Sequence, residues 1–139
     1  MLTVNVFVTS LSAERLWDVA RPMPPQVHIA VNINLLGLEG KSDVMAEAPF
    51  VFTVNFVPSV AQISIRGRAQ INGESDEIRK MLDESKQQKP PPLAVVQAVS
   101  NASMAEAILL SKAMNVPPPL PPLPAQTQAA KPSEARYTA

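Results

Sequence analysis

The feature that most constrains this fold is an apolar, helix-compatible segment that runs directly into a cluster of prolines. Residues 104–116 read Met-Ala-Glu-Ala-Ile-Leu-Leu-Ser-Lys-Ala-Met-Asn-Val, and residues 117–124 read Pro-Pro-Pro-Leu-Pro-Pro-Leu-Pro. Proline lacks a backbone N–H and its ring clashes with the preceding helical turn, so a helix cannot continue into the cluster. The sequence predicts a long helix over residues 93–116, followed by an extended Pro/Leu arm over residues 117–124.

The chain before this helix shows the two-residue period of β-strands. Four segments alternate in this way: residues 4–8, 27–36, 45–57 and 61–72. Short turns join the last three, which predicts an antiparallel meander. Residues 12–19 are compatible with one or two helical turns, inside a loop that crosses from the first strand to the second.

Charged residues gather in residues 74–89, where a narrow apolar stripe predicts a short surface helix that ends at the prolines after it. The expected fold is therefore α+β: a four-stranded antiparallel sheet, made of a crossing first strand plus a meander, packed by one long C-terminal helix. We expect a single domain over residues 1–124. The remaining residues, 125–139, are polar and without periodicity, which predicts a disordered tail.

Composition excludes several classes of function. Twelve basic and twelve acidic residues give no net charge, whereas nucleic-acid binders normally show a basic excess. Without cysteine and with a single histidine, His28, thiolate and multi-histidine metal sites are impossible. The carboxylates Asp43, Glu47, Asp76 and Glu77 are expected in surface salt bridges, and no phosphate loop or nucleophile elbow is present. We expect no enzyme activity, cofactor or nucleic-acid partner.

The N-terminus lacks the basic region of a signal peptide. Residues 48–65 are uncharged, but polar residues and Pro58 interrupt them, so we expect no membrane insertion. A cytoplasmic location is the resulting expectation.

The third predicted strand is apolar on both faces. Phe50, Phe52, Val54 and Phe56 share one face, and Val51 and Val57 lie on the other. These phenylalanines belong either in the core or in a subunit interface. Since one long and one short helix cover only one face of a sheet, we assign Phe50, Phe52, Val54 and Phe56 to an interface and predict a homo-oligomer, a dimer or a tetramer.

The order of these elements resembles the SecB family of export chaperones. The likeness covers residues 4–124: residues 9–12, Thr-Ser-Leu-Ser, lead into the crossing loop, residues 25–32, Pro-Gln-Val-His-Ile-Ala-Val-Asn, are similar to the start of the second strand, and residues 115–124 are similar to the Pro/Leu segment after the helix. The resemblance implies non-catalytic binding of unfolded or extended polypeptides. It also implies that apolar side chains of the crossing loop, Leu16, Trp17 and Met23, line the client groove; the alternative is that they cap the core.

Two features complicate the resemblance. Where the family docks its export motor on an acidic sheet face, this chain carries Arg66 and Arg68, so the sequence does not predict motor docking. The arm contains two overlapping PxxP patterns, residues 118–121 and 121–124, of the kind that polyproline-binding domains recognise. A scaffold or adaptor that binds a partner through its arm and tail is therefore the alternative function.

Overall fold

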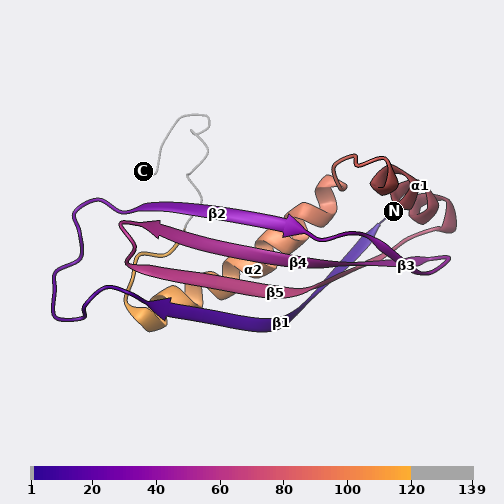
Figure 1. Ribbon diagram of the computed structural model, residues 1–139. Helices are drawn as coiled ribbons and strands as arrows, with labels where there is room; N and C mark the ends of the chain where they lie inside the picture. The colour runs from indigo at the N-terminus through magenta and orange to yellow at the C-terminus, as the bar shows by residue number, and fades with distance from the viewer. Residues whose placement is uncertain (1, 120–139) are drawn as a thin grey trace, which may run out of the picture.

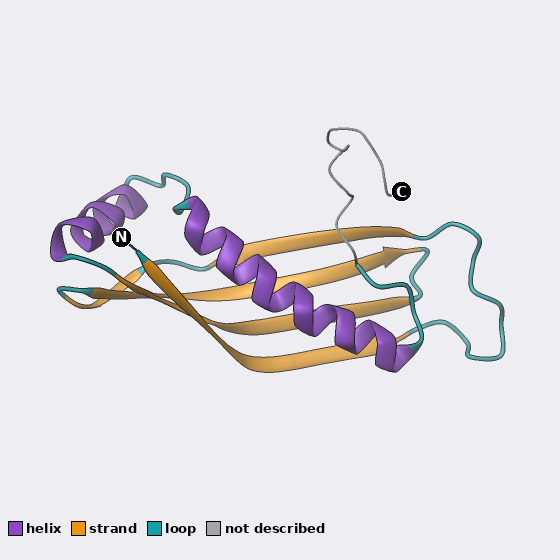
Figure 2. Cartoon of the chain, turned by 180° about the vertical axis from the view of Figure 1, so that it is seen from behind, coloured by secondary structure: helices purple, strands orange, loops and turns teal. Residues whose placement is uncertain are grey.

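The computed structural model describes residues 2–119 and shows one antiparallel sheet with a long helix lying diagonally across one face (Figures 1 and 2). The predicted α+β class is confirmed. The Pro/Leu arm from Leu120 onward and the predicted tail lie outside the described residues. In chain order the elements are β1 (Thr3–Arg15), β2 (His28–Leu35), β3 (Glu39–Ser42), β4 (Met45–Val57), β5 (Ala61–Asn72), α1 (Ser75–Lys86) and α2 (Leu93–Met114).

The strands follow the order β1-β5-β4-β2, and the short β3 pairs with the first part of β4. All pairings are antiparallel, so β2, β4 and β5 form the expected meander and β1 crosses over to pair with β5. The structure adds β3, which lies in the segment expected to be a turn between the second and third predicted strands. Both β1 and β2 are edge strands of this sheet.

The helical turns expected over residues 12–19 are absent, because β1 continues as a strand to Arg15. A bulge between Val8 and Ser10 shifts the register against β5, so that Val8 pairs with Gly67 and Leu11 pairs with Ile65. The extra residue shifts the alternation of faces along β1, so Leu11 shares the face of Ile65, although it is 49% exposed. Pairing with β5 thus overrides a local helical pattern.

The core lies between α2 and the sheet face that it covers. β4 and β5 both alternate buried and accessible residues along their length. On α2 the buried positions recur every four residues: Val95, Val99, Ser103, Ala107 and Ser111. The small side chains in the last three positions allow the C-terminal half of the helix to lie close to the strands.

One prediction about this core was wrong. Phe50, Phe52, Val54 and Phe56 are at most 2% exposed in the single chain, so they are core residues and not a subunit interface. The other face of β4 is only partly apolar, because Thr53 and Asn55 alternate there with Val51 and Val57. The single chain therefore buries the aromatic row, with α1, α2 and Val116 all contributing to the core.

Gly67 shows how tightly this core is packed. It lies on the buried face of β5, opposite Phe50 of β4 and Val8 of β1. A Cβ atom there would overlap the carbonyl oxygen of Phe7 and lie 2.8 Å from Cζ of the Phe50 ring. Only glycine allows the backbone and the ring to approach this closely.

Candidate functional site

The diagonal path of α2 leaves one part of the apolar sheet face uncovered. The helix lies mainly against β1 and β5 and less against β4 (Figure 2). Four apolar side chains of β2 face the same side as the core but remain only partly covered: Ile29, Val31, Ile33 and Leu35. We call these four residues the β2 strip. Val31, near its middle, is 39% exposed.

The backbone beside this strip is also free to bind. β2 pairs with β4 along one edge, and no other strand within residues 2–119 pairs with its opposite edge. An edge strand presents unpaired N–H and C=O groups, to which an extended polypeptide adds as a further strand. The β2 strip therefore combines apolar side chains with backbone groups available for hydrogen bonding.

A pocket of about 120 Å³ lies at the Leu35 end of the strip. Apolar side chains from β2, α1 and α2 line it, including Leu35, Met81 and Val95, together with the prolines of residues 90–92. Lys89 also lines it. Its volume approaches the roughly 150 Å³ of an engineered apolar cavity that holds benzene, so the pocket suits one apolar side chain of a bound segment.

The crossing loop, residues 16–27, leads into the Ile29 end of the β2 strip. Trp17 and Met23 are partly buried and pack against the core, whereas Leu16 is 47% exposed. The Trp17 indole is held on two sides: its Nε1 donates a hydrogen bond to the Pro22 carbonyl at 3.1 Å, and the Arg21 guanidinium lies 4.4 Å from the ring centroid. Trp17 and Met23 thus have the packing expected of residues that cap the core. The assignment of Leu16, Trp17 and Met23 to a client groove stays a prediction.

Arg15, which sequence reasoning missed, connects three elements at this end of the molecule. Its Nη1 donates hydrogen bonds to the carbonyl oxygens of Met114 at 2.7 Å and Asn115 at 3.1 Å, at the end of α2. Its Nε donates to the Trp17 carbonyl at 2.9 Å. Met114 and Asn115 lie 99 and 100 positions from Arg15 in the chain, so no local sequence pattern signals their contact with it.

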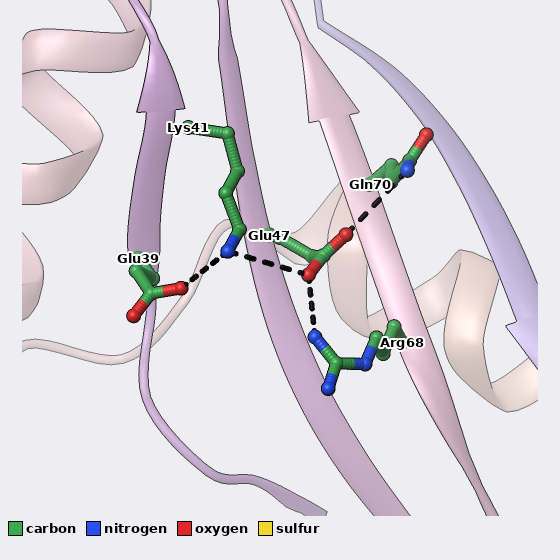
Figure 3. A network of polar contacts seen from close by, with 5 residues as sticks. All are labelled: Glu39, Lys41, Glu47, Arg68 and Gln70. Carbon is green, nitrogen blue, oxygen red and sulfur yellow. Dashed lines mark hydrogen bonds and ion pairs between the residues drawn. The ribbon is translucent and has the colours of Figure 1, made fainter.

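The opposite face of the sheet, which we call the open face, carries a network of charged side chains (Figure 3). Glu47 on β4 accepts a hydrogen bond from Arg68 Nη1 at 2.7 Å and a longer one from Gln70 Nε2 at 3.5 Å. Lys41 on β3 lies 2.6 Å from a Glu39 oxygen and 4.0 Å from Glu47. The hydrogen bond from Arg68 lowers the pKa of Glu47, so this carboxylate stays ionised near neutral pH and serves to join three strands rather than to move protons.

The other polar candidates are dispersed. His28 is exposed at the start of β2, and Asp76 forms a surface ion pair with Arg79 at 3.8 Å. Within residues 2–119, no three His, Cys, Asp or Glu side chains gather in a way that could hold a metal ion.

The outward side of α2 is a second surface that exposes large apolar side chains. Only 22% of its most apolar 18-residue window is buried, and Leu93 and Leu109 are 69% and 62% exposed. By length and composition alone α2 would be able to cross a membrane, yet it packs on the sheet through its buried stripe. The helix thus has one side on the core and an exposed side on which Leu93 and Leu109 lie among Gln97, Asn101 and Lys112.

Comparison with protein-family models, curated proteins and solved structures gives no match to this chain. The resemblance to the SecB family therefore stays a prediction that rests on the order of elements and on the residues quoted above.

Proposed function

We propose that this protein is a non-catalytic, chaperone-like binder of unfolded or extended polypeptides, related in architecture to SecB. The observation that carries the proposal is the β2 strip: an apolar row beside a free strand edge. An extended client would pair its backbone with β2 and place alternate side chains beside Ile29, Val31 and Ile33 on the same face of the sheet, because side chains of a strand recur on one face every second residue. The pocket next to Leu35 would take an apolar side chain at the end of the bound segment.

We further propose that the protein acts as a homo-oligomer, with the outward side of α2 in the interface. Leu93 and Leu109 are large apolar side chains exposed on this side, and exposed apolar patches often mark interaction sites. A second copy is the simplest cover, since a twofold axis brings the same surface of two chains together. Sedimentation at micromolar concentration tests this point, with Leu109→Glu as the variant expected to shift the protein to monomer. A wild-type 15 kDa monomer would refute it.

Client binding is tested by light scattering of an aggregating protein in the presence of wild type or of variants on β2. Val31→Asp places a charge on the strip, while Asn32→Asp places the same charge on the opposite face of the same strand. We expect wild type and Asn32→Asp to suppress aggregation at stoichiometric excess and Val31→Asp to lose most of this effect. Equal suppression by both variants, or none by wild type, would overturn the proposal.

The alternative role as a scaffold that presents its arm is tested by truncation after Val116. Pro119 is buried, so the PxxP pattern of residues 118–121 is partly packed against the domain at its start. We expect client binding to survive the truncation. Loss of a polyproline-binding partner on truncation, in a protein whose wild type suppresses no aggregation, would support the scaffold instead.

A further inference from the structure

The segment that leaves α2 turns back across the covered face of the sheet. Asn115 takes a left-handed conformation with φ 55°, and the Val116 N–H donates to the Ser111 carbonyl at 3.1 Å. The hydrogen bonds from Arg15 to Met114 and Asn115 hold this turn. The helix therefore ends in a fixed turn that determines the direction of the following residues.

Residues 115–119 run from the β1 side of the sheet toward β2. Figures 1 and 2 show this path from opposite sides, and in both views the segment rises across β5 and β4. Val116 is 6% exposed, and Pro119 is among the fully buried residues. The described chain thus ends packed against the sheet and directed at β2, over which α2 packs little.

We propose that the Pro/Leu arm of the same chain, residues 120–124, docks on the β2 strip, with Leu123 over Val31. The distance allows this contact. Neighbouring strands are about 4.8 Å apart, and four residues of polyproline II helix span about 12 Å, so Leu123 reaches β2 from Pro119. Polyproline II also has three residues per turn, which places Leu120 and Leu123 on the same side of the arm.

The chemistry of the arm makes this contact displaceable. Six of the eight residues 117–124 are prolines, which have no N–H to donate to the carbonyl groups of β2. The arm therefore contributes apolar contacts but few backbone hydrogen bonds. An ordinary extended polypeptide makes both kinds of contact and would replace it. Replacement of the arm by a client rests on the proposed function, but the contact of arm and strip does not depend on any client.

Cysteine cross-linking tests the contact, because the chain contains no cysteine. The test variant combines Val31→Cys with Leu123→Cys, and the matched control combines Asn32→Cys with Leu123→Cys. The two differ by one position on β2 and share the same tether, but residues 31 and 32 lie on opposite faces of the sheet. After mild oxidation, intact mass and non-reducing electrophoresis measure the intrachain disulfide.

We expect the Val31 variant to form the intrachain disulfide at least about tenfold faster than the Asn32 control, which corresponds to about 1.4 kcal/mol. Equal rates would overturn the proposal. Disulfides formed mainly between chains would also overturn it, since the strip would then take the arm of a second copy. Far-UV circular dichroism of both variants checks that each is folded.

A second measurement uses the full chain without added cysteines. Leu120→Ser/Leu123→Ser leaves every described residue intact, and we expect it to raise the fluorescence of the apolar dye 1-anilinonaphthalene-8-sulfonate severalfold by freeing the strip. Adding Val31→Asp should remove that increase. No increase in dye fluorescence would contradict the docked arm even if Val31 proved essential for clients. Conversely, cross-linking without any suppression of aggregation would leave the arm contact standing and refute the proposed function.

Discussion

β5 and β2 flank the central strand β4 and turn similar rows of apolar side chains to the same side of the sheet, yet they end in different environments. On β5, Ile63 and Ile65 are 2% and 0% exposed, whereas Val31 on β2 is 39% exposed. The difference comes from α2, which crosses β1 and β5 and does not extend over the middle of β2 (Figure 2). The same pattern of residues thus builds a core in one half of the sheet and an accessible apolar surface in the other.

The comparison is sharpest for two valines that face each other. Val54 on β4 and Val31 on β2 pair in register, but Val54 is 0% exposed. We expect Val54→Ala to lower the free energy of unfolding by about 2–3 kcal/mol, from lost apolar burial and the cavity left behind, and Val31→Ala to lower it by about 1 kcal/mol or less. Urea unfolding followed by circular dichroism measures both. Equal losses would mean that β2 is as well covered as β4.

Gly67 on β5 tests how tightly the covered half is packed. Gly67→Ala forces the added methyl against the Phe7 carbonyl and the Phe50 ring, so we expect a loss of about 1–3 kcal/mol. The control is Gly40→Ala on β3, where the new Cβ would lie 3.1 Å from the flexible end of Leu82. A Gly67→Ala protein as stable as the control would show that the strands of this half can separate easily.

Arg15 tests what holds the end of α2 over the covered half. We expect Arg15→Ala to cost about 1–2 kcal/mol, because the carbonyl groups of Met114, Asn115 and Trp17 lose a charged donor. Arg21→Ala, which removes only the cation over the Trp17 ring, should cost less, about 0.5–1 kcal/mol. Thermal unfolding ranks the stability losses of the two variants. A larger loss for Arg21→Ala would show that Arg15 does not anchor the helix end.

The smallest expected effect concerns the charged network beside β3. The pKa of Glu47 is lowered by its hydrogen bond from Arg68, so its contribution to stability is present above the ordinary carboxyl pKa near 4.5 and is lost as the pH falls through the lowered value. Between about pH 5 and about pH 3, wild type should lose stability more steeply than Glu47→Gln. Glu106→Gln, which removes a carboxylate that forms no ion pair within residues 2–119, should follow wild type. Parallel curves for wild type and Glu47→Gln would show that the network does not contribute to folding.

The sequence by itself determined the strand segments, the face of each strand that is apolar, the long helix and its end near the prolines. These features are local: a two-residue period defines a strand, and a proline stops a helix wherever the chain is placed. For this reason the α+β class, the meander and the crossing first strand were predictable from residues such as Ile63, Val54 and Pro117.

Only the tertiary structure decided which apolar rows are covered. The position of α2 buries Phe50 and Phe52, which had been assigned to a subunit interface, and leaves Val31 accessible, although nothing in the alternation of the two strands distinguishes them. The bulge after Val8 and the hydrogen bonds of Arg15 likewise join segments far apart in the chain. Burial is a property of what lies above a residue, and the diagonal path of one helix across the sheet is set by long-range packing that local sequence patterns do not encode.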